Sequence, residues 1–352
     1  MFLRQLNLTN FRNYQLLTLD FDNRPTILVG NNAQGKSNIL EAIYILSTSK
    51  SGRVETEDEL IKKEESFTKV EGLLEQPEMG LLTIINRPTE EVSFRKKLLV
   101  NGISRRVLDF IGNLPAVIFY PQDINMITGS PSLRRWHLDL GLAQVDSHYK
   151  KALTAYEQFL TARNRVLKAI REGRSRVDEL GFWTKGVLEN SKIVSEKRKE
   201  FFEFINSLNT PLGNFSFEFK PSEVSAQKLI ETNGREVASA TTLIGPHRDD
   251  FEILLDGRNL QHFGSRGEQR TATLAFKLAT LEYMAKIYGK RPVLLLDDVF
   301  SELDALHRAH VVEIVGKQQT IIATVELENI PKKFLDSARI LRVEDGKIKE
   351  GI

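Results

Sequence analysis

Gly30 to Ser37 reads GNNAQGKS and directly follows the apolar run PTILV, Pro25 to Val29. The spacing G-x-x-x-x-G-K-[ST] is that of a phosphate-binding loop, in which backbone N–H groups surround a phosphate. The preceding run has strand character, and residues 37–46 (SNILEAIYIL) carry apolar side chains at helical spacing. The positive end of that helix would face the phosphates. The stretch therefore predicts a strand–loop–helix unit that binds a nucleotide.

Two side chains of this loop have predicted roles of their own. Lys36 supplies positive charge to the β- and γ-phosphate oxygens, and the Ser37 hydroxyl is a ligand of Mg²⁺. We thus expect ATP and Mg²⁺ as cofactors, although kinases, motors, GTPases and DNA-repair ATPases all carry such a loop. The other predicted nucleotide contacts of the loop are Gly30, Asn31, Asn32, Ala33, Gln34 and Gly35.

Composition excludes several classes of protein. The 352 residues are enough for a full core and for two domains. With no cysteine, the chain has no disulfide, thiolate metal site or cysteine nucleophile. No apolar run approaches the roughly 20 residues that span a bilayer, so we expect a soluble, cytoplasmic protein without a membrane partner. The formal charge of +2 means that affinity for nucleic acid would come from local basic patches.

The chain changes character along its length. Residues 1–124 are rich in strand patterns, residues 125–209 are helical, and strand patterns return within residues 210–352. One helix is predicted from Ser147 to a stop at Gly173, and about 27 residues of helix span about 40 Å. These patterns predict an α/β domain that is split in sequence by an inserted helical segment, with domain boundaries at 124/125 and 209/210.

A second apolar run ends in two acids. Pro292 to Asp298 reads PVLLLDD, as expected of a Walker B strand lying beside the strand of the phosphate-binding loop. We expect Asp297 to act in the Mg²⁺ shell and Asp298 to act as the general base or water-orienting group. The segment Ser301 to Asp304 (SELD) follows immediately.

Gly264 to Arg270 (GSRGEQR) opens a long amphipathic pattern. Taken alone, it predicts an ordinary helix start with Ser265 as the N-cap. Taken with the aspartates about 30 residues later, it resembles the signature motif of ABC-type ATPases. That resemblance implies that Ser265 and Gly267 contact the γ-phosphate of ATP bound to a second subunit, so that ATP joins two copies into a homodimer.

Several segments together resemble the bacterial RecF family, and the resemblance covers essentially the whole chain. The segments are LTNFRNY (8–14), FYPQDINMITGSPSLRRWHLDL (119–140), GPHRDD (245–250), SRGEQRT (265–271) and LLLDDVFSELD (294–304). The resemblance implies an α/β ABC-type ATPase head with an inserted helical arm. It also implies an ATP-controlled clamp that binds duplex DNA and single-/double-strand junctions as a dimer. It also implies partners similar to RecR and RecO, and a RecA-like recombinase that the clamp helps to load.

The resemblance assigns further residues. Arg12 and Asn13 match the position where this branch contacts the nucleotide phosphate and base. Gln122 fits the Q-loop, which links Mg²⁺ and the attacking water to the helical lobe, and Thr324 occupies the switch position after its strand. The chain departs from the family pattern at Gln122, where Glu is usual, and at His137, where an aromatic residue is usual.

A basic stretch in the helical segment is the candidate DNA surface. Residues 126–209 hold fifteen Lys/Arg and ten Asp/Glu, a net charge of +5 in a chain of +2. Arg163, Arg165, Lys168 and Arg171 are predicted to contact DNA phosphates, while the plain alternative is a solvated helix face. His247 to Asp250 (HRDD) lacks a third and a fourth metal ligand nearby, so a structural loop is the favoured interpretation.

One alternative of a different class remains. A small-molecule phosphotransferase would carry the same phosphate-binding loop and would place its acceptor pocket in the helical insertion. Turnover that depends on DNA and on protein concentration would favour the clamp, whereas dependence on a metabolite acceptor would favour the phosphotransferase.

Overall fold

The computed structural model describes residues 2–88, 94–303 and 305–350 of the chain. These residues form two compact units: Met1–Ile124 with Thr273–Ile352, and Asn125–Ala272. No helix among the described residues is long and apolar enough to cross a membrane. Asp304, the last residue of the SELD segment that follows the Walker B strand, lies outside the described residues.

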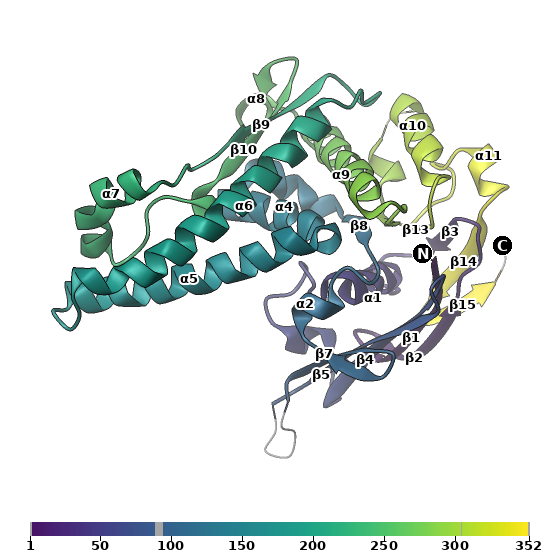
Figure 1. The fold of residues 1–352 in the computed structure, drawn as a ribbon. Helices are drawn as coiled ribbons and strands as arrows, with labels where there is room; N and C mark the ends of the chain where they lie inside the picture. Colours follow the sequence, from purple (N-terminus) through teal and green to yellow (C-terminus); the bar gives the residue numbers. More distant parts are fainter. Residues whose placement is uncertain (1, 89–93, 304, 351–352) are drawn as a thin grey trace. The chain divides into compact units, whose positions relative to one another are not determined.

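The first unit contains a six-stranded antiparallel sheet in the order β2-β1-β4-β5-β6-β7 (Figure 1). Its strands are β1 (Phe2–Phe11), β2 (Tyr14–Asp20), β4 (Phe67–Glu75), β5 (Met79–Asn86), β6 (Lys96–Val100) and β7 (Ile103–Arg105). An Asn101-Gly102 turn joins β6 to β7, and both residues have the positive φ angles, 51° and 75°, that such a hairpin turn requires.

A second sheet in the same unit is mainly parallel, in the order β15-β14-β3-β13-β12-β8. Its strands are β3 (Thr26–Val29), β8 (Ala116–Phe119), β12 (Val293–Asp297), β13 (Thr320–Thr324), β14 (Arg339–Glu344) and β15 (Lys347–Glu350). The prediction that the Walker B strand lies directly beside the loop strand is wrong, because β13 pairs with both β3 and β12 and separates them. The carboxyl ends of β3, β13 and β12 nevertheless meet at one edge, where open α/β sheets bind ligands.

Helix α1 (Lys36–Thr48) contacts both sheets of the first unit, β4 and β5 in one and β8, β12 and β13 in the other. Eleven of its thirteen residues are buried, which is typical of a helix enclosed on all sides rather than lying on a surface. The helix that follows the phosphate-binding loop is therefore the centre of this unit's core. The other helical segments that lie entirely within this unit are η1 (Glu57–Leu60), α2 (Val107–Phe110), η2 (Pro121–Ile124), η5 (Phe300–Glu302), α10 (Ala305–Val315) and α11 (Lys332–Leu335).

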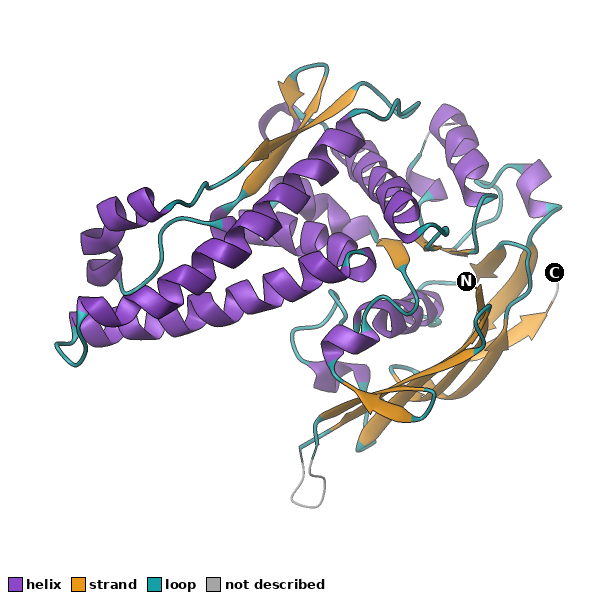
Figure 2. Cartoon of the chain, viewed as in Figure 1, coloured by secondary structure: helices purple, strands orange, loops and turns teal. Residues whose placement is uncertain are grey.

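The second unit is built on an antiparallel helical hairpin of α5 (Ser147–Arg171) and α6 (Leu180–Asn206), shown in Figure 2. Asp146 caps α5 by accepting bonds from the N–H groups of His148 and Tyr149, and Gly173 follows the helix with a φ of 71°. The predicted long helix is therefore confirmed. The other elements are α3 (Asn125–Thr128), α4 (Pro131–Val145), η3 (Val177–Glu179), β9 (Phe215–Lys220), α7 (Ala226–Ser239), η4 (Pro246–Arg248), β10 (Asp250–Leu255), β11 (Arg258–Asn259) and α8 (Leu260–Phe263).

The two units divide the chain differently from the sequence prediction. The first boundary coincides with the predicted one at 124/125, but the second lies at 272/273 instead of 209/210. The reason is that strands β9, β10 and β11 pair with each other, that β9 packs against α6, and that helix α7 packs against α5. Helix α9 (Arg266–Tyr288) consequently begins in the second unit and ends in the first.

Candidate nucleotide-binding site

The phosphate-binding loop connects β3 to α1, and its glycines are there for identifiable reasons. Gly35 has a φ of 113°, in the left-handed region that side chains rarely adopt. Gly30 packs against β14 so closely that a Cβ atom would lie 2.3 Å from the carbonyl oxygen of Val343. Gly35 is thus required by its backbone conformation, and Gly30 is required because there is no space for a side chain.

Side chains from distant parts of the chain fix the loop backbone. The amide of Asn13 donates to the carbonyl oxygen of Gln34 at 3.0 Å and accepts from the side chain of Asn38 at 2.9 Å. The side-chain oxygen of Gln34 accepts from the backbone N–H of Asp345 at 2.5 Å. Asn13, predicted as a nucleotide contact, therefore stabilises the loop conformation through its side-chain hydrogen bonds.

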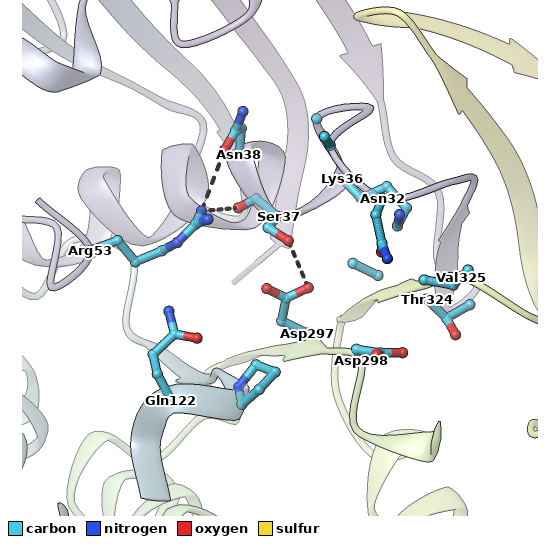
Figure 3. A pocket seen from close by; sticks show the side chains of 14 residues that line it. Asn32, Lys36, Ser37, Asn38, Arg53, Gln122, Asp297, Asp298, Thr324 and Val325 are labelled. Atoms are coloured by element: carbon cyan, nitrogen blue, oxygen red, sulfur yellow. Dashed lines mark hydrogen bonds between the residues drawn. The ribbon is translucent and has the colours of Figure 1, made fainter. Parts of the chain in front are cut away.

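A cavity of about 320 Å³ opens at the loop, and it brings most of the predicted site residues together (Figure 3). They come from four separate stretches of sequence that meet at the edge of the parallel sheet. The lining residues are Asn32, Ala33, Gly35, Lys36, Ser37, Asn38, Arg53, Pro121, Gln122, Asp297, Asp298, Ala323, Thr324 and Val325.

Lys36 is 7% exposed, and its Nζ donates to the carbonyl oxygens of Gly30 and Asn31, each at 2.7 Å. Burial lowers the pKa of Lys36, and the nearby charges of Asp297 and Asp298 oppose that shift. The ammonium group is thus confined to the loop, beside the space that the loop encloses.

Ser37 and Asp297 connect the loop to the Walker B strand. The Ser37 hydroxyl donates to a carboxylate oxygen of Asp297 at 2.9 Å, across the width of the intervening strand β13. Burial raises the pKa of Asp297, and the bond from Ser37 opposes that shift. The two residues predicted as Mg²⁺ ligands are therefore adjacent.

Asp298 has two unusual features. Its φ is 50°, a left-handed conformation that costs a non-glycine residue energy, and its backbone N–H donates to the carbonyl oxygen of Ala323. Its Oδ1 atom is buried and has no hydrogen-bond partner. A buried carboxylate oxygen without a partner is costly, and it marks a position where function outweighs stability.

Two further predicted residues, Gln122 and Thr324, also line this cavity. Gln122 lies on the short helical turn η2 and lines the cavity (Figure 3). Thr324 also lines it, but its hydroxyl donates to the carbonyl oxygen of Glu326 at 2.9 Å and so closes a local turn. Ser301, which is not among the residues that line this cavity, donates to the carbonyl oxygen of Asp298.

A neighbouring cavity of about 630 Å³ shares Asn38 and Arg53 with the first and is also lined by Arg12 and Asn13. Arg12 forms a two-point ion pair with the buried carboxylate of Glu41, at 3.0 and 2.8 Å. The Arg12 guanidinium is therefore already paired with Glu41. Arg12 nevertheless lines a cavity next to the phosphate-binding loop, as expected of a nucleotide contact.

Sequence reasoning missed Arg53. Its guanidinium donates from a single nitrogen to Glu41, to the side chain of Asn38 and to the carbonyl oxygen of Ser37, at 3.3 to 3.4 Å. It lines both cavities and is the second cation that Glu41 holds. The only sequence signal was an arginine in the Ser/Gly-containing loop after the loop helix, which is too common to single out.

Ser265 and Gly267 belong to the second unit and are not among the residues that line these two cavities. Ser265 accepts a bond from the N–H of Glu268, and the Glu268 carboxylate accepts from the N–H of Ser265 at 2.7 Å. This reciprocal pair is a capping box, so within one chain Ser265 acts as the N-cap of helix α9. Both Ser265 and Gly267 are exposed, and their contact with a second subunit stays a prediction.

The structure contradicts one predicted DNA contact. Arg163 is 2% exposed, and it pairs with the buried Glu236 at 2.6 Å while also bonding to Thr184 and Thr242. It faces the interior because it continues the helical spacing of the buried residues Tyr149, Ala152, Tyr156 and Leu167. This spacing can be read from the sequence, but a count of basic residues does not reveal it. Arg165, Lys168 and Arg171 are exposed.

The His247–Asp250 segment is a structural turn. His247 bonds to the Tyr156 hydroxyl at 2.6 Å and to the carbonyl oxygen of Thr242, while Asp249 pairs with the buried Arg198 at 2.7 Å. Within the described parts of the chain, no group of three or more His, Cys, Asp or Glu residues is arranged to hold a metal.

Comparison with known proteins places this geometry in context. Residues 2–349 match the family described as RecF/RecN/SMC N terminal domain. The chain is 34% identical over 371 residues to the DNA replication and repair protein RecF of Bacillus cytotoxicus, covering 99% of this chain and 98% of the relative. The RecF of Bacillus thuringiensis is 34% identical over 373 residues, with the same two coverages.

Solved structures give the same result. The recombination mediator protein RecF with ATPrS, of the RecFOR pathway, has a TM-score of 0.86 and 29% identity, covering 100% of this chain and 98% of that one. The corresponding RecF-ATP structure has a TM-score of 0.87 and 28% identity, covering 99% of each chain. An Smc head domain from Pyrococcus furiosus, bound to part of ScpA, has a TM-score of 0.53 and 18% identity over 99% of this chain and 95% of that one, which supports the fold alone. The predicted α/β ATPase-head fold is confirmed.

Proposed function

Because the chain belongs to the RecF family of DNA replication and repair proteins, we propose that it is a recombination mediator whose hold on DNA is controlled by ATP. The observation that carries the proposal is the convergence of Lys36, Ser37, Asp297 and Asp298 on one cavity beside the start of a buried helix. Family membership argues against the alternative of a small-molecule phosphotransferase.

ATP binds with its phosphates at the loop. The N–H groups at the start of α1 and the ammonium of Lys36 stabilise the phosphate charge. Among the described residues, the acceptors of the Lys36 ammonium group are the carbonyl oxygens of Gly30 and Asn31, and phosphate oxygens are stronger acceptors for an ammonium group. The neighbouring cavity that Arg12 and Asn13 line accommodates the nucleoside.

The residues present fit Mg²⁺. This ion is commonly held by one or two protein oxygens together with substrate phosphates and water, so it needs no cage of acidic residues. Ser37 and Asp297 supply two adjacent oxygens beside the loop, and Gln122 lines the same cavity. When bound there, Mg²⁺ neutralises the charge that develops on the phosphate oxygens.

Hydrolysis requires a group that orients water and accepts its proton. Asp298 lines this cavity, and its carboxylate is the group that orients a water molecule in line with the γ-phosphate in this proposal. Gln122 and Thr324 line the same cavity and act as positioning residues in this proposal. Hydrolysis of ATP then releases the protein from DNA.

The clamp forms when two copies share ATP. The exposed capping-box turn at Ser265 and Gly267 offers backbone N–H groups at the start of the long helix α9, a suitable site for a phosphate bound to another subunit. The related RecF structures are described as parts of the RecFOR pathway, and we propose RecO- and RecR-like proteins as partners and a RecA-like recombinase as the protein delivered.

DNA binding is proposed for the exposed side of α5. Arg165, Lys168 and Arg171 are exposed and form no ion pair with the described residues, so their charges are free to meet phosphates of duplex DNA or of single-/double-strand junctions. No recognition helix is evident among the described residues, and such contacts do not discriminate between base sequences.

ATP turnover tests the proposal. The rate per molecule should rise when gapped duplex DNA is added and when the protein concentration is increased, because hydrolysis follows dimer formation. Lys36→Met serves as the control that removes phosphate binding. Turnover that ignores both DNA and protein concentration but rises with a metabolite acceptor would replace the clamp with a phosphotransferase.

A further inference from the structure

Aromatic side chains gather near the end of the α5–α6 hairpin, in a region that we call the arm tip (residues 159–185). Phe182, at the start of α6, is 68% exposed although it is a large apolar residue. Its ring centroid lies 5.0 Å from that of Trp183 and 5.9 Å from that of Phe159 on α5. Neighbouring rings therefore hold the Phe182 ring in place while most of its surface stays in water.

The rings in contact with Phe182 lie at steep angles to it. It meets Trp183 at 80° and Phe159 at 61°, both edge-type arrangements, and no ring of the described residues stacks on it. By contrast, Phe202 in the interior of the same unit stacks on Phe219 with planes only 10° apart. A positioned, exposed aromatic face is what stacking on a nucleic-acid base requires.

The charge around the arm tip indicates an anionic partner. Residues 165–185 contain six basic and three acidic side chains. Two of the acids pair locally, Glu172 with Arg174 and Asp178 with Arg176, whereas Arg165, Lys168 and Arg171 form no ion pair with the described residues. Lys185 follows Phe182 by three positions and so is its neighbour on the helix surface.

We propose that the arm tip binds an unpaired base of DNA by stacking it on Phe182, while neighbouring basic side chains contact the flanking phosphates. The proposal rests on the proposed DNA-binding function and adds to it a means of choosing between DNA structures. Bases in a continuous duplex already stack on each other, whereas a gap or junction exposes bases to an aromatic face. Phe182 therefore favours gapped DNA over intact duplex.

Three substitutions of one residue separate stacking from other effects. Binding of full-length protein to a gapped duplex and to a continuous duplex of equal length is measured at one salt concentration. Phe182→Ala and Phe182→Leu should each lose at least about fivefold in affinity for the gapped DNA, the effect of losing one base–aromatic stack, with duplex affinity unchanged. Phe182→Tyr should retain the preference because it keeps the aromatic face.

Phe263 provides a matched control, because it is 67% exposed and lies in the same unit but outside the arm tip. Phe263→Ala should bind both DNAs as the unaltered protein does. A direct readout comes from Trp183, since the chain has only two tryptophans and Trp136→Phe leaves Trp183 alone. Its fluorescence should change with gapped DNA and not with continuous duplex, and Phe182→Ala should remove the change.

The outcomes are distinguishable. If Phe182→Ala binds gapped DNA as tightly as the unaltered protein, the stacking role is wrong. If Phe182→Leu binds as well as Phe182→Tyr, the contact is merely apolar and the proposal also fails. If the unaltered protein binds neither DNA at any salt concentration, the proposed function itself is refuted.

Discussion

At the scale of single residues, the nucleotide site contains groups that cost the protein stability. Asp298 keeps a left-handed backbone and a buried oxygen without a partner, and Asp297 keeps a buried carboxylate next to it. Buried charges of this kind are tolerated where a ligand completes the site. Each of the two aspartates therefore gives a prediction in which stability and activity separate.

Asp298→Asn should trap the ATP-bound form. The amide keeps the shape of the side chain but cannot accept a proton from water, so hydrolysis should fall on the order of 10²-fold or more while ATP affinity is retained. The unaltered enzyme should itself be slow, because ABC-type ATPases with fast turnover commonly carry Glu here and a shift of ~1 Å in a catalytic group can cost about 10²-fold. Single-turnover hydrolysis at saturating protein and DNA measures both. Tens of turnovers per second in the unaltered protein would contradict the expectation of slow hydrolysis.

Asp297→Asn should raise stability and weaken function. Burial raises the pKa of Asp297, so the folded protein binds a proton there more tightly than the unfolded chain does. This carboxyl therefore contributes less stability as the pH rises from the ordinary Asp range through the raised pKa. Asparagine removes that loss and should raise the melting temperature of the nucleotide-free protein at pH 7.

The Asp297→Asn protein should also lose Mg²⁺-dependent ATP binding, because one ligand oxygen of the site no longer carries a charge. Melting curves between pH 4 and pH 8 provide the check: the stability gain over the unaltered protein should shrink as the pH falls. A gain that stays constant with pH would mean that the carboxylate charge is not its cause.

At the scale of elements, helix α5 has a buried face and an exposed face. Arg163 lies on the buried face and joins α5 to α6 through Thr184 and to α7 through Glu236. Arg165, Lys168 and Arg171 lie exposed on the same helix. Substitutions on the two faces should therefore separate folding from DNA binding.

Arg163→Met should destabilise the protein by about 3–5 kcal/mol, because it leaves the buried Glu236 without its partner. The triple change Arg165→Gln, Lys168→Gln and Arg171→Gln should leave stability within about 0.5 kcal/mol. It should instead flatten the salt dependence of duplex binding, by about 0.9 in log–log slope for each phosphate that the protein no longer neutralises. Urea unfolding and binding titrations at several salt concentrations measure the two effects. An unchanged slope would place the DNA surface elsewhere.

What the sequence could predict at this scale depended on how local the signal was. The phosphate-binding loop and the Asn101-Gly102 turn are encoded within a few residues, so both were recognisable. The position of β13 between β3 and β12 was not, because strand order depends on pairing between segments that lie far apart in the sequence. The boundary at 272/273 was missed for the same reason, since β9 and β10 resemble head strands until their packing partners are known.

The site divides in the same way. Lys36, Ser37, Asp297 and Asp298 were predictable because motif spacing assigns them, and the structure places them around one cavity. Arg53 was not, because its role depends on Glu41, which brings it and Arg12 together from separate segments.

At the scale of the whole molecule, the proposed clamp depends on two copies acting together. The phosphate-binding loop belongs to one compact unit and the Ser265 turn to the other. If ATP bridges the loop of one subunit and the turn of another, each subunit carries two half-sites, and neither half-site is sufficient alone. Clamping, slow hydrolysis and release all follow from this composite site.

Sedimentation velocity of two defective variants, alone and mixed, tests the composite site most directly. Ser265→Arg spoils the half-site offered to the partner, and Lys36→Met spoils the phosphate-binding half-site. Each variant alone should sediment with ATP as it does without ATP. An equal mixture should regain an ATP-dependent dimer, because pairing the two variants leaves one composite site intact. Ser265→Arg protein that dimerises with ATP by itself, or a mixture that does not dimerise under conditions where the unaltered protein does, would contradict the composite site.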